Sequence, residues 1–600
     1  MDLILTMGGI PPEMGTQKRR IVCFDASIMQ SLALQGLSVM VYDSEIEPAL
    51  GRRAEELAFE LSKSWHLLGD EDFTAYKNIS LGQSHEWTLW WGSLCPKIKF
   101  VVALQSLIRR EKPSTIQYEE GICEWKIEIL QKLAAAHSPT IKITPFSQAA
   151  PKKNTQNKQN ANTSFVRWMS EHLKISAFAF LSFIGPIRRR PARSRIRVLG
   201  GTYFSILNVW ARWAKERPFE LVLLDPPAQM LQKKGFAFSM PEIFKTPKER
   251  KADGEQLRQI QKRWVEAKGN KSYRSRYRMD GFDYFEVFES ELDEVVANTL
   301  PKYAQEFEAD QHSLASERIG LVALPFDVPP RESLLIQAAK NARIPTVTIL
   351  HGFPFLPEFD DRDNLQTDYL FVWGKWMQER FEKMGKGKKM RIIQTGNPKF
   401  DSIDPHLLEN PWTPPKGRSR ILILSSPQLG SSVLSSDEEP SRYAQELLEA
   451  LKDLGADITL KLHPSEKEKT YQELLGSLSE SITITRSGDI LAYVEKSDIV
   501  IGPQSTALLE AMLMGRPVLY FNKTGFRCDA PLFNNRDGLR EYTDAKEVRR
   551  SIDRLLGNEP KAMEGHRPSR EQMEYYCGPL DGKSSQRVLE AIGRILDERT

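Results

Sequence analysis

Short apolar runs of strand length alternate with amphipathic stretches of helix length over most of the chain. In residues 1–145, the strand-like "LILTM" and "STIQYEE" alternate with helix-like segments such as "EWKIEILQKLAAA". This alternation is typical of a parallel sheet covered by helices. The pattern therefore predicts a Rossmann-like α/β unit over residues 1–145.

Two further α/β units are expected downstream. One begins at "RIRVLGGTYF" (195–204) and continues to "TVTILHG" (346–352), interrupted by a charged, helix-rich insertion over 240–318. The other runs from "DYLFVWG" (368–374) to "RPVLYFN" (516–522). Two adjacent doubly wound units would place a cleft at the carboxyl ends of their strands.

The predicted organisation therefore has five parts. They are an accessory unit (1–145), a linker with a basic amphipathic segment (146–195), an acceptor-side domain (196–367) with the insertion 240–318, a nucleotide-binding domain (368–545) and C-terminal helices (546–600). Residues 129–143 also align without a gap with residues 335–349, which indicates a duplication of the first unit in the second.

The linker region carries two different compositions. A polar low-complexity stretch, "AAPKKNTQNKQNANTS", precedes residues 164–195, which combine Trp168, the run "AFAFLSFI" and a cluster of five arginines at 188–195. Aromatic and apolar residues beside an arginine cluster are typical of an interfacial membrane anchor. A helix buried between domains, with a solvated basic end, explains the same pattern, and both interpretations stay open.

Composition and charge narrow the function classes. The hydrophobic content of 40% and the charged content of 27% suit a globular protein, and a net charge of +4 is small for 600 residues. Nucleic acid is therefore not required as a partner, although "KSYRSRYR" (271–278) is basic with interleaved tyrosines. Acidic residues follow that stretch at once, so a solvated helical insertion is the preferred interpretation.

The cysteines and the apolar segments indicate the compartment. Five scattered cysteines without a CxxC pair argue for reduced thiols, and against a disulfide framework or a structural zinc site. The start "MDLILTMGGI" has no basic region typical of a signal peptide. The longest apolar run, 175–187, contains a proline and is too short to span a bilayer. We expect a cytoplasmic protein that residues 164–195 could hold at the inner face of the membrane.

Three short polar motifs follow apolar strands. His351-Gly352 and His463-Pro464 each end a strand, and Ser505-Thr506 begins a helix after "DIVIGPQ". Ser505 and Thr506 are good helix caps, and the N–H groups of such a helix start can also bind an anion. Within this stretch neither role is excluded. Each motif alone has an ordinary structural explanation, but the carboxyl ends of parallel strands are where such sheets bind ligands.

The motifs "ILHGFP", "TGNPKFD", "LKLHPSE" and "SDIVIGPQSTALLEAMLMGRPVLYF" occur in this order within residues 320–525. As a set they resemble bacterial surface-polysaccharide glycosyltransferases of the two-Rossmann GT-B fold. The nearest groups are CDP-glycerol glycerophosphotransferases and the CMP-sugar-dependent Kdo and polysialic acid transferases. "TGNPKFD" and the glycine–serine helix start are also similar to UDP-N-acetylglucosamine 2-epimerases.

The resemblance implies a site for a nucleotide-sugar donor. It assigns donor phosphate or nucleotide contacts to Gly396, His463, Pro464, Gln504, Ser505, Thr506 and Glu510, with Glu510 at the ribose. The expected activity is inverting transfer without a metal or other cofactor, from a CMP-sugar in preference, to a surface glycan or glycolipid. The "DDRD" pattern (360–363) is interpreted as solvated surface rather than a metal site.

The catalytic base is expected on the acceptor side. Among carboxylates near strand ends, Asp327 and Glu332 rank ahead of Asp225, because "FDVPPRE" follows a strand and opens a helix. Acidic residues at a helix start also complement its dipole, which explains them without catalysis. The resemblance adds His351, since the HG histidine is catalytic in the phosphotransferase branch.

Three alternative functions remain. The chain could be a CDP-glycerol-type polyol-phosphate transferase, a UDP-GlcNAc 2-epimerase-like enzyme or a non-catalytic scaffold of the same fold. An epimerase acts on a soluble substrate, which leaves the accessory unit and the basic segment without a purpose. The joint presence of His351, His463 and Ser505 argues against a decayed scaffold.

Overall fold

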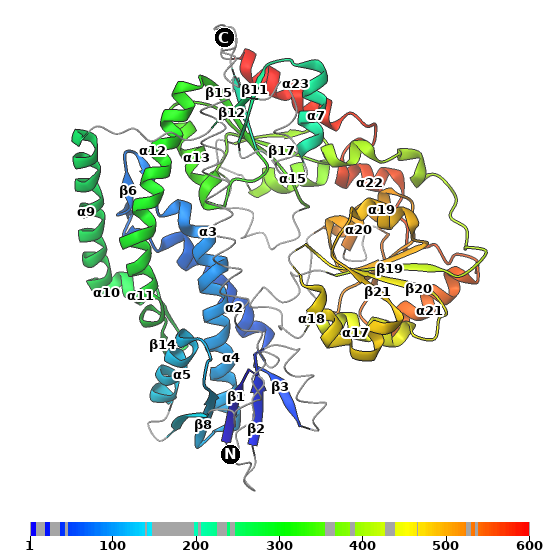
Figure 1. Cartoon of the computed structure of the whole chain (residues 1–600), viewed down its shortest axis with the longest axis horizontal. Coiled ribbons are helices and arrows are strands. Elements are labelled where there is room, and N and C mark those ends of the chain that lie inside the picture. The colour runs from blue at the N-terminus through cyan, green and yellow to red at the C-terminus, as the bar shows by residue number, and fades with distance from the viewer. Residues whose placement is uncertain are drawn as a thin grey trace, which may run out of the picture.

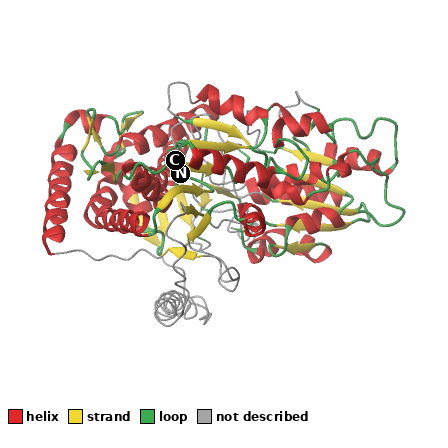
Figure 2. Cartoon of the chain, turned by 90° about the horizontal axis from the view of Figure 1, so that it is seen from above, coloured by secondary structure: helices red, strands yellow, loops and turns green. Residues whose placement is uncertain are grey.

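The apolar runs form three open parallel sheets with one common strand order. The computed structural model describes residues 2–7, 19–24, 37–42, 46–137, 141–146, 197–201, 206–224, 237–239, 247–353, 366–384, 390–425, 439–464, 466–523, 530–533 and 538–598. Helices lie on both sides of the strands (Figure 2). The third unit, yellow to orange in Figure 1, lies beside the other two.

The first sheet has the order β3-β2-β1-β8-β9. Its strands are β1 (Asp2–Thr6), β2 (Arg19–Cys23), β3 (Val39–Val41), β8 (Thr115–Glu119) and β9 (Lys142–Phe146), all parallel. β1 is buried along its whole length, which is expected of a central strand covered on both faces.

The middle and third sheets extend the same order. The middle sheet, β12-β11-β10-β15-β16-β17-β18, contains β10 (Arg197–Gly200), β11 (Glu220–Leu224), β12 (Ala237–Ser239), β15 (Ile319–Leu324), β16 (Thr346–Ile349), β17 (Tyr369–Val372) and β18 (Arg391–Gln394). The third, β21-β20-β19-β22-β23-β24, contains β19 (Arg420–Leu424), β20 (Asp457–Lys461), β21 (Thr483–Thr485), β22 (Ile499–Gly502), β23 (Val518–Phe521) and β24 (Glu541–Tyr542). Strands that run outward on both sides of the first strand define the doubly wound Rossmann order. The expected fold class, two adjacent Rossmann-like units of the GT-B kind behind an N-terminal α/β unit, is confirmed.

The expected boundary at residue 367 is wrong. β17 and β18 pair in parallel with β16 and with each other, so residues 368–397 complete the middle sheet instead of opening the third. The sequence showed two more strands but not which sheet they join, because apolar strands of neighbouring units look alike. Gly396 therefore belongs to the middle unit.

The C-terminal helices return to the middle unit. α22 (Arg570–Cys577) packs on α15 (Lys375–Met384), and α23 (Ser584–Asp597) packs on α7 (Leu207–Glu216). Both carboxylate oxygens of Asp401 accept N–H groups at the start of α23, from Ser584 at 2.8 Å and Ser585 at 2.7 Å. Asp401 thereby satisfies donors that a helix start leaves open.

The sequence suggested an insertion over residues 240–318. Within that range, the described residues 247–316 are instead the counterpart of residues 48–111. α9 (Pro247–Gly269) corresponds to α2 (Pro48–Ser64), and α12 (Leu300–Ser316) to α4 (Cys95–Glu111). α4 and α12 both have 17 residues, carry a proline in the first turn and follow a five-residue π-helical turn. The duplication indicated by the sequence thus extends over the whole unit.

A β-hairpin at the same place in both units strengthens this equivalence. β6 (Ala75–Tyr76) and β7 (Ile79–Ser80) enclose Lys77-Asn78, and β13 (Arg278–Met279) and β14 (Phe282–Asp283) enclose Asp280-Gly281. All four turn residues have positive φ, as a two-residue type I′ turn requires.

The two repeats pair through equivalent elements. Gln337 on α13 (Pro330–Asn341) accepts from Ser80 N and donates to Ser80 O, at the last residue of the first hairpin. Lys132 on α5 (Glu124–His137) donates to Glu286 O, just after the second hairpin. The helix that follows the fourth strand of each unit therefore contacts the other unit at the matching place.

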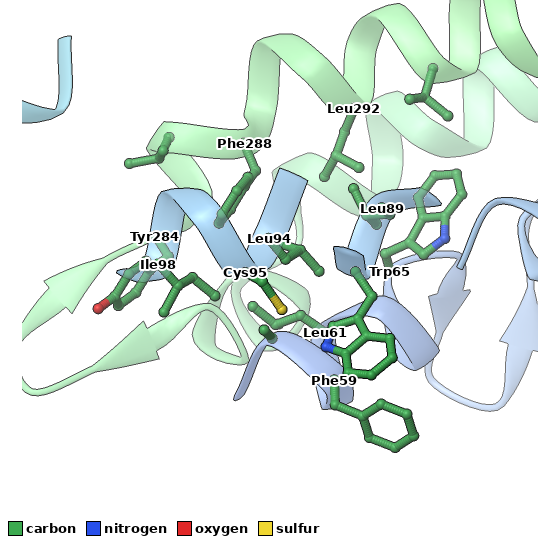
Figure 3. Close-up of a cluster of buried hydrophobic side chains, with 14 of the residues drawn as sticks. Phe59, Leu61, Trp65, Leu89, Leu94, Cys95, Ile98, Tyr284, Phe288 and Leu292 are labelled. Carbon is green, nitrogen blue, oxygen red and sulfur yellow. The ribbon is translucent and has the colours of Figure 1, made fainter. Parts of the chain in front are cut away.

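One apolar core fills this interface. Figure 3 shows Leu89, Leu94 and Ile98 of the first unit facing Phe288 and Leu292 of α11 (Phe285–Glu294). Tyr273 and Tyr277, from the basic stretch considered for nucleic acid, are 1% and 2% exposed in the same core. The interleaved tyrosines are therefore core residues, and the expectation of a solvated insertion is corrected.

Some predictions fall outside the described residues. The segment 164–195, "DDRD" and Asp225 all lie there. Within the described part of the chain, no helix is both long enough and apolar enough to cross a bilayer.

His66 provides a pH-dependent test of the packing within the first unit. Its ring lies between Glu86 at 3.1 Å and Asp72 at 3.4 Å. Burial alone would lower the pKa of His66, but hydrogen bonds and charge from these two carboxylates raise it to about 9. A histidine with a raised pKa stabilises the fold fully below its unfolded pKa, near 6.5, and loses that effect as pH rises through 9.

We therefore expect His66→Gln to cost about 3 kcal/mol at pH 6, where the half-buried Asp72 and the buried Glu86, which keeps Lys63, lose the charge of His66, and much less at pH 9.5. Calorimetric melting at both pH values measures the gap between variant and wild type. His312→Gln, at an exposed position on α12, is the control. A gap that does not shrink with rising pH would contradict the charged histidine.

Candidate functional site

The carboxyl edge of the third sheet collects the HP motif and the start of α20 (Thr506–Leu513). His463 follows β20 and Ser505 follows β22, and β19 lies between these two strands. Since neighbouring strands are about 4.8 Å apart, the two motifs come from strands about 10 Å apart. The spacing suits one phosphate group bound between them.

A network fixes the backbone at His463. Its N–H donates to Ser425 Oγ at 3.0 Å and to Glu466 Oε2 at 2.8 Å, and Tyr471 holds Glu466 at 2.7 Å. The His463 and Pro464 side chains are exposed. Partial burial lowers the pKa of His463, so the ring is a neutral hydrogen-bonding group at pH 7.

The hydroxyls at the start of α20 have two different partners. Ser505 Oγ accepts from Leu508 N at 3.2 Å, so the local capping role is present. Thr506 Oγ1 accepts from Phe353 N at 3.3 Å, which joins this helix start to the loop after His351. Gln504 is buried and accepts from Tyr520 OH at 3.3 Å, so its side chain supports the edge from the core.

His351 lies at the carboxyl edge of the middle sheet, directly after β16. Its Nδ1 lies 3.1 Å from Pro325 O. A carbonyl can only accept, so Nδ1 carries the proton and Nε2 is the nitrogen that can take one up. Burial lowers the pKa of His351, which keeps the ring neutral. A neutral imidazole with a fixed tautomer is suited to general base chemistry.

An aromatic cluster holds the loop after His351. The Phe353 ring stacks on Trp376 with centroids 5.0 Å apart, and lies 6.2 Å from Phe533 of the third unit. Together with the Thr506 contact, this packing brings the edges of the middle and third sheets together at residues 351–353.

Asp327 is buried and is bound to the backbone of residues 366 and 367. It is 3% exposed, and its Oδ2 accepts from Gln366 N at 2.6 Å and from Thr367 N at 3.4 Å. Its role as the catalytic base stays a prediction. Glu332 lies half-buried in the first turn of α13, and its catalytic role stays a prediction.

Gly396 is needed for chain packing. Its φ is +82°, and a Cβ there would lie 2.4 Å from Ser584 Oγ. The C-terminal segment thus fills the side on which another residue would project. A contact between Gly396 and the nucleotide stays a prediction.

Glu510 forms an ion pair that the sequence analysis missed. Its Oε1 accepts from Lys399 Nζ, and its side chain is 1% exposed. Lys399 lies in the "TGNPKFD" motif of the middle unit, so the pair joins two units. The only sequence signal was the lysine within that motif.

Among the described residues, no group of three or more His, Cys, Asp or Glu side chains could hold a metal ion.

Comparisons with known proteins give distant similarity to solved structures. No protein family matches the chain, and no curated protein matches it. A putative UDP-N-acetylglucosamine 2-epimerase from Listeria monocytogenes is 16% identical, with 68% of this chain and 98% of that one covered and a TM-score of 0.41. A variant of the wall teichoic acid polymerase TagF is 12% identical (75% and 99%, TM-score 0.36), and the glycosyltransferase SnogD from Streptomyces nogalater is 14% identical (66% and 100%, TM-score 0.35). Similarity at this level does not assign a ligand or a reaction to this chain.

The variant Asp327→Asn tests whether Asp327 only holds the backbone of residues 366 and 367 or also acts as the catalytic base. Burial raises the pKa of Asp327 to about 6, against the two hydrogen bonds that lower it. Because the folded pKa exceeds the unfolded one, the free energy of unfolding falls as pH rises from about 4 to 6. Asparagine keeps the acceptor oxygen without the charge. We expect the variant to gain stability relative to wild type between pH 4 and 8, by at most about 3 kcal/mol.

Melting curves at both pH values measure this gain, and any transfer activity should survive the substitution. A variant that melts normally but has lost all activity would instead make Asp327 the base.

Proposed function

We propose that the chain is an inverting, metal-independent glycosyltransferase that moves a sugar from a nucleotide donor to a surface glycan or glycolipid. The reaction would take place between the carboxyl edges of the middle and third sheets. The observation that carries this proposal is the contact between Phe353 N and Thr506 Oγ1. This contact joins the loop after His351, whose ring is suited to act as a general base, to the start of α20, which is suited to bind a phosphate.

The third unit would bind the donor. The N–H groups and dipole of α20, the hydroxyls of Ser505 and Thr506 and the neutral ring of His463 all favour an anion at this edge. The same groups would stabilise the negative charge of the departing nucleotide. Capping by Ser505 leaves its hydroxyl proton available, because Ser505 Oγ acts there as an acceptor.

The middle unit would activate the acceptor. His351 Nε2 would take the proton from the acceptor hydroxyl as its oxygen attacks the anomeric carbon, and the bond to the nucleotide would break on the opposite face. The hydrogen bond from Nδ1 to Pro325 O holds the ring in the required tautomer throughout.

A polyol-phosphate transferase of the CDP-glycerol type is the second candidate. It would use the same residues, with His351 activating a hydroxyl that attacks phosphorus instead of carbon. The fixed tautomer of His351 serves either reaction, so the identity of the donor decides between them. Membrane contact through residues 164–195 stays a prediction for either activity.

A nucleotide panel tests the proposal directly. We expect CMP or CDP to raise the melting temperature more than UDP or GDP at equal concentration, because the motifs resemble enzymes with cytidine donors. A ligand at 100 times its Kd stabilises the native state by about 2.7 kcal/mol. If no nucleotide shifts the melting temperature, the proposed function is wrong, and a larger shift with UDP than with CMP and CDP would move the donor to the uridine class.

His463→Ala tests the phosphate contact. A hydrogen bond to a charged group contributes about 1.5–3 kcal/mol, so Kd for the preferred nucleotide should rise about 10- to 150-fold. The melting temperature without nucleotide should stay unchanged, since the ring is exposed. His406→Ala, at an exposed position outside the two edges, is the calorimetric control. Equal Kd values for the two variants would remove His463 from the site.

A further inference from the structure

A charge pair links the proposed donor site to the middle unit. Glu510 lies on α20, one helical turn after Thr506 and on the same helix face, since residues four apart lie above one another. Its partner Lys399 lies in the 3₁₀ turn Pro398–Ser402 after β18. The pair therefore lies about 6 Å along the helix from the expected phosphate position.

Two buried polar atoms, one on Glu510 and one on Asn397, which lies two residues before Lys399, have no hydrogen-bond partner among the described residues. They are Glu510 Oε2, an acceptor, and Asn397 Nδ2, a donor. Both residues are 1% exposed. Asn397 Oδ1 accepts from Lys399 N at 3.0 Å, which fixes the amide so that its nitrogen is the open atom. Buried polar atoms are normally paired, so an open acceptor and an open donor indicate a ligand with hydroxyl groups.

The charge of Glu510 depends on Lys399. Burial raises the pKa of Glu510, and charge and hydrogen bonding from Lys399 oppose that effect. The other titratable groups that face Glu510 are Asp489, ahead of α19 (Ile490–Lys496), which raises the pKa further, and the buried Cys577 thiol of α22. Among these facing groups, Lys399 is the cation.

We propose that Lys399 is a positioning residue that holds Glu510 as an ionised, fixed acceptor for the ribose hydroxyls of the bound nucleotide. The inference rests on the proposed function, because it needs a nucleotide at α20. The ribose contact of Glu510 follows from the family resemblance, whereas the part played by Lys399 follows from the ion pair and the two open atoms. Lys399 itself need not touch the ligand.

Calorimetry with CMP and 2′,3′-dideoxy-CMP tests this role. Wild type should bind the ribonucleotide at least about 10-fold more tightly than the dideoxy form, which lacks both hydroxyls. Glu510→Gln and Lys399→Met should reduce that preference to within about threefold, and Lys399→Arg should keep it. Lys375→Met, which removes an exposed lysine of α15 from its pair with Glu379, is the matched control.

Measurements over a range of pH distinguish the effect of the charge on Glu510 from the effect of the changed side-chain shape. In Lys399→Met, the preference for ribose should increase as pH rises, because burial raises the pKa of Glu510 and the carboxylate then ionises only at higher pH without its cation. In Glu510→Gln no such increase is possible, since the amide does not titrate. The ribose preference of wild type should therefore appear at lower pH than that of Lys399→Met.

Distinct outcomes separate this inference from the proposed function. If wild type binds neither CMP nor any other nucleotide, the proposed function fails. If wild type binds CMP but Lys399→Met keeps the full ribose preference at pH 7, the positioning role is overturned.

The double variant Lys399→Met/Glu510→Gln covers a folding failure of the single lysine variant, since it buries no unpaired charge. It should match Glu510→Gln in ribose preference. A further loss would show that Lys399 contacts the ligand directly, which would overturn a role through Glu510.

Discussion

The close backbone contact between the middle unit and the C-terminal segment is the constraint on which the proposed site depends. A Cβ on Gly578 would lie 2.4 Å from Trp373 O and 2.9 Å from the Cα of Gly396. No side chain fits between these segments, so the chain returns to the middle sheet with little freedom. α23 then packs on the middle sheet, and Asp401 caps its start.

The packing of the C-terminal segment on the middle unit determines how the edges of the middle and third sheets meet at the proposed site. Residues 373–400 and 508–513 share one apolar core with α22. The contact between Thr506 and Phe353 and the pair between Lys399 and Glu510 both lie at the border of that core. The His351 loop and the start of α20 are therefore held by packing, which suits groups that must act on one substrate together. Residues of the first and middle units also share one apolar core.

The sequence predicted the elements of the site better than their partners. The positions of His351, His463 and Ser505 at strand ends followed from apolar periodicity, because the carboxyl ends of parallel strands share one edge. Lys399 and Glu510 are 111 residues apart, and Asp401 and Ser584 are 183 residues apart. No local pattern marks such pairs. The burial of Asp327 could not be predicted either. The sequence "FDVPPRE" is compatible with an exposed helix start and equally with a carboxylate bound to the backbone of residues 366 and 367.

By itself, the sequence determined that the protein is an α/β chain with three parallel units, and it indicated that the first two are related. Strand length, helix periodicity and the aligned helix–strand segments are local properties, and backbone hydrogen bonding turns them into secondary structure. Only the tertiary structure decided which sheet β17 and β18 join and that residues 247–316 repeat an earlier unit. It also decided that Tyr273 and Tyr277 are core residues and that Glu510 has a cation. Each of these depends on burial against residues distant in the chain, because an apolar or charged side chain acquires its role only from the surface that covers it.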